Sequence, residues 1–259
     1  MTGGNLERPN HKERYSDKDR EIYAEIKTLP PVIVRADGRN FKRVLNADFK
    51  KPYDERFAKG LAKATAIFFE TSGFDPKLAY LFSDEINLLF THLPFGGRIE
   101  KLDSVIASFF ASALTIVLDF KEALAFDARI IPLCSEEDIR VYLTQRQAEA
   151  WRNHINAYGY YGLQELGLSE KEAETQLKGM KAAQVHEMLY RRGVNLNETP
   201  AWQRRGILIA RERYEKKGYD PKADKDVRVA RYKIVQLWNL PLFGSEEGRE
   251  LIEQLIDRS

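Results

Sequence analysis

Cysteine is almost absent from this sequence, since Cys134 is the only one among 259 residues. A lone cysteine excludes an intrachain disulfide and a cysteine-based zinc site, and it favours a reducing compartment. We also expect no membrane-spanning helix, because no apolar run in the sequence approaches the roughly 18 residues that such a helix needs. The first residues are charged where a secretory signal would be apolar. We therefore expect a cytoplasmic protein with no membrane partner.

A strong overall charge is missing too, because the net charge is only +2. The distribution is uneven: 191–233 holds 13 Lys and Arg against 6 Asp and Glu, or +7, which leaves −5 for the rest. Such a segment is either a solvated face or a surface for a polyanion. With 43% hydrophobic residues, the chain has enough apolar side chains for a substantial core.

Hydrophobic periodicity predicts a regular order of elements in the first half of the chain. An amphipathic helix is expected up to residue 29, on the spacing of Ile22, Tyr23, Ile26 and Leu29. Strands are then expected at 32–37, 78–82, 86–90 and 126–133, with helices at 53–71 and 100–118. This β-α-β-β-α-β order is typical of an α/β, ferredoxin-like fold, in which the third strand lies between the first two.

That topology has a consequence for three carboxylates far apart in the sequence. Asp37 follows the first strand, and Asp84 and Glu85 occupy the turn between the second and third strands. All three are expected at one edge of the sheet. Clustered carboxylates repel unless a cation neutralises them, and hard oxygen ligands suit Mg²⁺ bound together with phosphates. Taken singly, each is as well explained as a turn former.

The second half predicts helices, then a hairpin. Ser135 with Asp138 and Ser169 with Glu172 are typical of helix N-termini, and the runs 206–214 and 227–235 flank a turn-rich linker. The last residues from Ser245 predict a short helix. The expected organisation is an N-terminal helix (1–29), a palm-like core (30–134), a helical extension (135–195), a basic β-hairpin (196–243) and a C-terminal helix (244–259).

Several ordered motifs resemble the tRNA-histidine guanylyltransferase family. They are VRADGRNFKRV, FKKPYDERFA, LAYLFSDEINLLF, GGRIEKLDSVIASFFAS, FDARIIPL, YLTQRQAEAWRNHIN and RRGVNLNETPAWQRRGIL, which together cover about 30–210. The resemblance implies a polymerase-palm core that adds nucleotides to the 5′ end of tRNA in the 3′-to-5′ direction. It also implies two Mg²⁺ ions, GTP or another NTP as substrate, and a homodimer or homotetramer.

Carried over to this sequence, the resemblance makes Asp37 and Asp84 catalytic metal ligands, with the Gly38 carbonyl as a further ligand and Glu85 supporting the site. It assigns the triphosphate to four positions: Lys51, Ser83, Arg98 and Lys101. Arg35 is a weaker candidate for phosphate contact, because it shares strand parity with Asp37 and should leave the sheet on the same face. Taken singly, the cations among them are more often solvated surface charges. In the basic segment, six residues are expected to contact RNA phosphates: Arg204, Arg205, Arg211, Arg213, Lys216 and Lys217. Trp202 and Tyr214 are candidates for stacking on bases or for packing.

One departure from the family pattern is informative. Eukaryotic members carry H-I-N-N-L-Y-N after R-Q-A-D, a motif tied to activation of a 5′-monophosphate by ATP. Here Trp151 stands at the His position, and Val185 stands where those members have Lys. The sequence therefore resembles the prokaryotic branch, which implies template-dependent repair of 5′-truncated tRNA, and it leaves open whether ATP is used. His154 and His186 are as well explained as packed or surface histidines.

The function expected is Mg²⁺-dependent nucleotide addition to tRNA, with guanosine addition to histidine tRNA as the alternative. Two other classes stay open at this point. A nucleotidyl cyclase would use the same carboxylates but leave the basic hairpin without a role. A non-catalytic RNA-binding protein would use the hairpin but leave the Asp37 and Asp84 pair unexplained.

Overall fold

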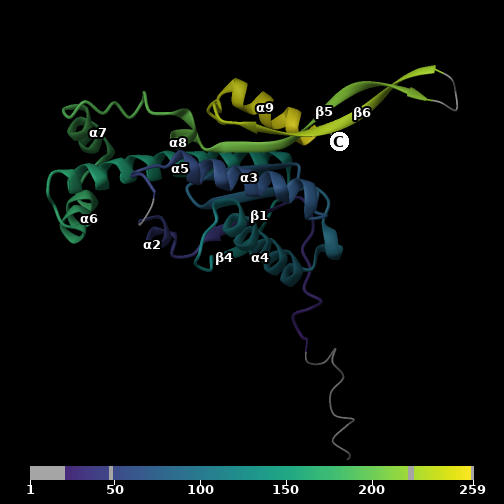
Figure 1. Cartoon of the computed structure of the whole chain (residues 1–259), viewed down its shortest axis with the longest axis horizontal. Helices are drawn as coiled ribbons and strands as arrows, with labels where there is room; N and C mark the ends of the chain where they lie inside the picture. The colour runs from purple at the N-terminus through teal and green to yellow at the C-terminus, as the bar shows by residue number, and fades with distance from the viewer. Residues whose placement is uncertain (1–20, 47–48, 221–224, 258–259) are drawn as a thin grey trace, which may run out of the picture.

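The computed structural model describes residues 21–46, 49–220 and 225–257 (Figure 1). Its first half contains β1 (Val32–Gly38), α2 (Phe41–Asn46), α3 (Glu55–Thr71), β2 (Leu78–Phe82), β3 (Glu85–Phe90), the 3-10 turn η2 (Pro94–Gly97), α4 (Ile99–Leu118) and β4 (Phe126–Pro132). Its second half contains α5 (Glu136–Glu165), α6 (Glu170–Lys178), α7 (Ala182–Tyr190), α8 (Ala201–Arg205), β5 (Ile207–Asp220), β6 (Lys225–Leu237) and α9 (Glu246–Asp257).

A six-stranded sheet organises the molecule, in the order β4-β1-β3-β2-β5-β6. Every neighbouring pair is antiparallel, so β1 and β2 run parallel with β3 between them. The predicted α/β, ferredoxin-like order is confirmed. The helical extension and the long basic hairpin that were predicted after it are also present.

Each face of the sheet carries its own apolar core. On one face α3 and α4 pack against Val34, Leu81 and Leu88, and on the other α5 and α9 pack against Ile33, Leu89 and Leu208. Successive residues of a strand point to opposite faces, which explains why the central strands are apolar throughout. Burial on both faces fixes the register, because a slip of one residue would exchange the two cores.

Helix α4 corrects the expectation that no apolar run is long enough to span a membrane. An 18-residue stretch of this 20-residue helix has a mean hydropathy of 1.6, which is sufficient in length and composition for a span. The helix buries Leu102, Ile106, Phe110 and Leu114 against the sheet. Core packing accounts for this face of the helix, and 28% of the apolar stretch is buried in all.

The helical extension begins with the long helix α5, whose second half carries α6 and α7 (Figure 1). The Ser135 hydroxyl accepts a hydrogen bond from the Asp138 N–H, and Ser169 with Glu172 forms a reciprocal capping box. Both predicted helix starts are confirmed. A small core of Ile155, Val185 and Leu189 joins α5 to α7.

The basic hairpin is continuous with the palm-like sheet. Strand β5 pairs with β2 from Leu81↔Ile207 to Leu78↔Ala210 and then runs on with β6 alone. In Figure 1 these two strands leave the body of the molecule as a long twisted ribbon. The hairpin is thus an extension of the sheet that carries the carboxylates.

The N-terminal helix predicted up to residue 29 is not found in its described part. Residues 21–29 form a turn and an isolated bridge between Lys27 and Arg98, and residues 1–20 lie outside the described range. Ile22, Tyr23 and Leu29 are more than 60% exposed, so the expected apolar stripe has no surface to pack against. The short helices α2 and α8 were not predicted.

Candidate active site

Asp37, Asp84 and Glu85 meet at one edge of the sheet, as predicted. Asp37 and Glu85 are direct cross-strand partners, and the Gly38 N–H donates to the Asp84 carbonyl over 3.2 Å. We call this end of the sheet the acidic edge. Strand alternation places the side chains of Asp37 and Glu85 on the face covered by α5.

The turn between β2 and β3 holds Asp84 close to the β1 backbone. Phe82 and Glu85 are paired, so Ser83 and Asp84 form a two-residue turn, with Ser83 in the left-handed region at a φ of 52°. The Ser83 hydroxyl donates to Asp84 Oδ1 over 2.9 Å. A Cβ at Gly38 would lie 2.9 Å from Asp84 Oδ2 and 2.5 Å from the Phe41 ring, so this approach requires glycine.

The charges at the acidic edge are destabilised by burial and by one another. Burial, together with the charge of Asp37, raises the pKa of Asp84 to about 6, although the Ser83 hydroxyl opposes the shift. The pKa of Asp37 is raised by burial and by Asp127, which lies opposite it on β4. Arg129 and Arg35 act in the opposite direction on Asp37. A bound cation would relieve the repulsion.

Glu85 is held by partners of its own. Arg146 of α5 donates to both carboxylate oxygens, from Nε over 3.0 Å and from a terminal nitrogen over 2.5 Å, and Asn87 Nδ2 donates over 2.8 Å. The Tyr142 hydroxyl, one turn before Arg146, donates to Asn87 Oδ1 over 2.7 Å. Through these contacts Glu85 ties α5 to the acidic edge, and its predicted catalytic role stays a prediction.

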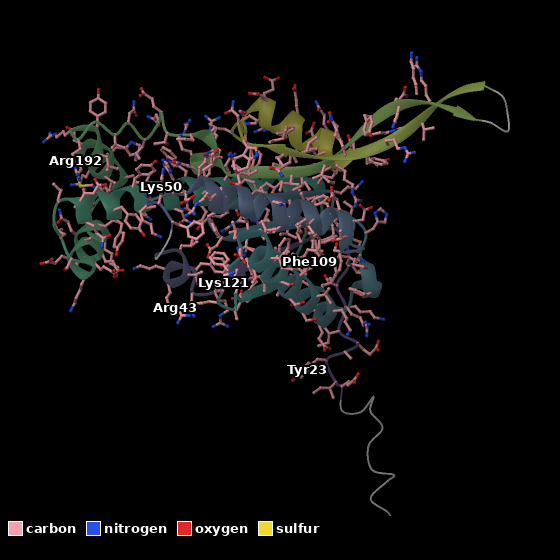
Figure 2. All side chains as sticks on the ribbon, in the orientation of Figure 1. Tyr23, Arg43, Lys50, Phe109, Lys121 and Arg192 are labelled. Carbon is pink, nitrogen blue, oxygen red and sulfur yellow. The ribbon has the colours of Figure 1, made fainter. Side chains whose placement is uncertain are left out.

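A cleft lies beside the turn and contains two of the predicted triphosphate residues, Lys51 and Ser83. Its other walls are largely aromatic and include Phe49, Tyr53 and Trp202. Lys50, which also lines this cleft, is labelled in Figure 2. Burial lowers the pKa of the Lys51 ammonium group, which shows that it is not a freely solvated surface charge. The Ser83 hydroxyl contacts Asp84, and Lys51 lines the same cleft. A hydroxyl and a cation suit a phosphate chain, and the aromatic walls suit a base.

The other predicted triphosphate residues divide into two groups. Arg35 lies on the same face of β1 as Asp37 and contributes to its charge environment, and its Nε is buried with no hydrogen-bond partner among the described residues. Arg98 and Lys101 do not reach the acidic edge in this chain. Arg98 bridges to Lys27 ahead of β1, at the end of the sheet where β1 begins, about 20 Å along the strand from Asp37.

The six predicted RNA contacts also divide. The guanidinium groups of Arg204 and Arg205 donate to the carbonyls of Thr199 and Leu240, and Arg211 pairs with Asp75 and donates to the Phe69 carbonyl. The other three are exposed and form no ion pair with a described residue; we call them the hairpin cations: Arg213, Lys216 and Lys217. Nitrogen-bearing side chains stand clear of the body along this ribbon in Figure 2.

The donor set at the acidic edge fits a magnesium site completed by substrate. Among the described residues no group of three His, Cys, Asp or Glu is arranged to hold a metal ion. Asp37 and Asp84 supply two carboxylates, and Gly38 adds a carbonyl. Mg²⁺ is usually bound by one or two carboxylates together with waters and substrate phosphates, so this set is of the expected kind.

Sequence reasoning missed the side chains around the carboxylates. Arg146 and Tyr142 come from α5, and Asp127 and Arg129 come from β4, where Arg129 donates to Asp127 over 2.7 Å. The spacing of Tyr142 and Arg146 places both on one helix face, which was a usable signal. Strand alternation would also have placed Asp127 and Arg129 on a single face of β4.

Comparison with known proteins identifies the family. A sequence model described as tRNAHis guanylyltransferase matches residues 15–134, and a second, described as the Thg1 C terminal domain, matches residues 137–236. The chain belongs to the tRNA(His) guanylyltransferase family. It is therefore an enzyme of the nucleotidyltransferase class, and the resemblance predicted from the motifs is confirmed.

Relatives in this family are similar over most of the chain. A probable tRNA(His) guanylyltransferase of Drosophila melanogaster is 32% identical over 70% of this chain and 67% of its own length. Its counterpart in Mus musculus is 31% identical over 71% of this chain and 65% of its own length. The chain thus spans about two thirds of these relatives.

Solved structures in the family share the fold. A bacterial tRNA(His) guanylyltransferase (Thg1)-like protein in complex with ATP matches with a TM-score of 0.71 and 25% identity, over 93% of this chain and 96% of that one. The same kind of protein in complex with GTP matches with a TM-score of 0.65 and 26% identity, over the same shares of the two chains. Members of this fold therefore bind nucleoside triphosphates.

Proposed function

We propose that this enzyme adds nucleotides to the 5′ end of tRNA in the 3′-to-5′ direction, with Mg²⁺, and that it repairs tRNA lacking its first nucleotide. The observation that carries the proposal is the juxtaposition of Asp37 and Asp84 with the Lys51 and Ser83 cleft. Ser83 connects the two, because it lines the cleft and its hydroxyl donates to Asp84. The carboxylates would hold metal, the cation and the hydroxyl would hold phosphates, and the aromatic walls would hold a base. This combination suits phosphoryl transfer, which depends on positioning and charge stabilisation.

In the reaction, the 3′-hydroxyl oxygen of the incoming NTP bonds to the α-phosphorus at the 5′ end of the tRNA. The bond from that phosphorus to pyrophosphate breaks, and the hydroxyl proton leaves to solvent. Bound Mg²⁺ would lower the pKa of the hydroxyl and neutralise the phosphates. Asp37, Asp84 and the Gly38 carbonyl would hold the metal. Lys51 and Ser83 would orient the triphosphate. Arg146 would hold the Glu85 carboxylate in an ion pair, so that it does not compete with Asp37 for the metal.

The hairpin cations support RNA as the second substrate. Exposed Lys and Arg on an extended ribbon neutralise phosphates without reading bases. Two exposed tyrosines of the hairpin stand opposite arginines, since Tyr214 pairs with Arg231 and Tyr232 with Arg213. Cation and aromatic side chains together suit RNA, whose shape and exposed bases are recognised in this way.

The surroundings of Trp151 and Val185 support repair over activation of a 5′-monophosphate. The Trp151 indole stacks on the His154 ring, with centroids 5.4 Å apart and planes inclined by 19°. Val185 is 2% exposed, in the core between α5 and α7. Neither position presents a cation to ATP, so a substrate that already carries a triphosphate is favoured.

The test uses tRNA transcripts that lack the first nucleotide and differ in the base opposite the gap. We expect the added nucleotide to change with that base, on several tRNAs, and 5′-triphosphate ends to react better than 5′-monophosphate ends. Base pairing would then supply the selectivity.

The second candidate is guanosine addition to histidine tRNA, favoured by the names of the relatives. Addition of guanosine whatever base stands opposite, restricted to tRNA with a histidine anticodon, would refute repair and establish this candidate. The assay is run at the protein concentration where its oligomeric state has been measured, because a homodimer or homotetramer remains a prediction.

A further inference from the structure

A second cavity lies on the other side of α8 from the acidic-edge cleft. It encloses about 680 Å³ and shares no lining residue with that cleft. Trp202 of α8 lines the cleft, whereas Arg204 and Arg205 of the same helix line the second cavity. Its volume is within the range of small-ligand sites.

The charge in this cavity has no counterpart within the described residues. Arg204 and Arg205 are half-buried and adjacent, and among the described residues their guanidinium groups donate to the backbone carbonyls of Thr199 and Leu240. Neither forms an ion pair with a described carboxylate. Burial and the neighbouring Arg205 lower the pKa of Arg204. Two half-buried guanidinium groups without an anion are a favourable place for a phosphate.

The rest of the lining suits a nucleobase. Trp151 borders the cavity with its half-buried indole, and Ala148 and Leu242 add apolar surface. Asn197 lies at the wall with an exposed side chain that forms no hydrogen bond with a described residue. An indole offers a stacking surface, and a free amide both donates and accepts hydrogen bonds, which are the groups that hold an unpaired base.

We propose that this cavity binds a single nucleotide, with the phosphate at Arg204 and Arg205 and the base against Trp151 and Asn197. The nucleotide is either a free nucleoside monophosphate or an unpaired residue of RNA. The second source rests on the proposed function, because only an RNA substrate brings such a residue to α8. The adjoining cleft would then hold the reacting nucleotide, while this cavity holds a neighbouring one.

The experiment is photolabelling of the full chain with 8-azido-AMP, followed by mapping of the labelled peptides. We expect label within 142–152, which contains lining residues of this cavity and none of the cleft. Trp151→Leu should raise the half-saturating probe concentration about tenfold, equivalent to about 1.4 kcal/mol. Because Trp151 also packs on His154, a second variant is needed. Asn197→Asp places a negative charge in the cavity that takes the phosphate, without touching the core, and should raise the half-saturating probe concentration about threefold.

Asn156→Asp is the matched control, since Asn156 is exposed on α5 and lines neither cavity. Label confined to cleft peptides, or an equal response of Asn197→Asp and Asn156→Asp, would overturn the proposal. Competition by unlabelled AMP and by a single-stranded RNA hexanucleotide distinguishes the two sources. Labelling needs no nucleotide transfer, so the two experiments are independent. Failure of the tRNA assay would refute the proposed function, whereas nucleotide binding in this cavity is decided by the labelling result alone.

Discussion

Replacing Arg146 by Met should destabilise the protein by about 3 kcal/mol, because it leaves the Glu85 carboxylate buried without its cation. Breaking a buried ion pair by removing one partner costs about 3–5 kcal/mol. The side chains of Arg146 and Glu85 are 19% and 9% exposed, so some water reaches the pair and we take the lower end of that range. This is a large share of the roughly 5–15 kcal/mol by which folded proteins are stable.

The double variant Arg146→Met with Glu85→Gln tests the cause. A neutral amide can still accept from Asn87, and no buried charge is left, so stability should return to within about 1 kcal/mol of the parent. Urea unfolding at neutral pH, with the slopes compared, measures each free energy. Arg140→Met is the control, because Arg140 lies on the same helix but pairs with two exposed carboxylates, Glu137 and Glu253. Loss of these exposed ion pairs should lower the free energy of unfolding by less than about 1 kcal/mol.

The reasoning fails if Arg146→Met costs less than about 1 kcal/mol, or if the double variant is no more stable than the single one. Either result would mean that Glu85 is hydrated or protonated without Arg146. The clamp between α5 and the acidic edge would then be a weak surface contact.

Three further outcomes are expected. Asp37→Ala and Asp84→Ala should each abolish nucleotide addition and leave tRNA binding nearly intact; a residual rate above about a tenth, a loss under about 1.4 kcal/mol, would contradict their role as metal ligands. Replacing the three hairpin cations by Gln should weaken the binding of all tRNAs alike and reduce the slope of log affinity against log salt concentration. An unchanged slope would show that these side chains are solvated surface charges that do not contact RNA. The third concerns His154, which is fully buried and whose pKa is lowered by burial from 6.5 to about 4. Protonation therefore favours the unfolded chain, and the free energy of unfolding should fall by about 3 kcal/mol in all as the pH drops from about 6.5 to about 4. The stability gap between the parent and His154→Gln, measured by urea unfolding, should therefore narrow across that range, and a constant gap would show that the imidazole is not buried in its neutral form.

The sequence was sufficient for the sheet and for the acidic edge, because both follow from strand alternation and from the βαββαβ order. Asp37 and Glu85 had to be neighbours once β3 was placed between β1 and β2. The contact of Arg146 with Glu85 spans 61 positions and depends on where α5 crosses the sheet, which no local pattern encodes. The position of Arg98 could have been derived, since β3 leads away from the acidic edge to the turn before α4. The predicted N-terminal helix was wrong over its described part, 21–29, because a helical spacing of apolar residues predicts a helix only where a surface can cover it.

The direction of β5 determines how far the hairpin cations lie from the turn that carries Asp84, and hence how far from that turn they would contact RNA. The strand begins at Ile207, paired with Leu81 next to the reacting turn, and runs away from it. At about 3.4 Å per residue, Arg213 lies about 20 Å and Lys217 about 34 Å further along the ribbon. The backbone hydrogen bonds that build the sheet therefore also fix the distance between the turn and the hairpin cations. If the hairpin cations bind RNA as proposed, an RNA with its 5′ end at Asp84 would meet the hairpin only if its body continues that far in the right direction. Length and rigidity of the substrate would then be criteria for selection without any contact to a base.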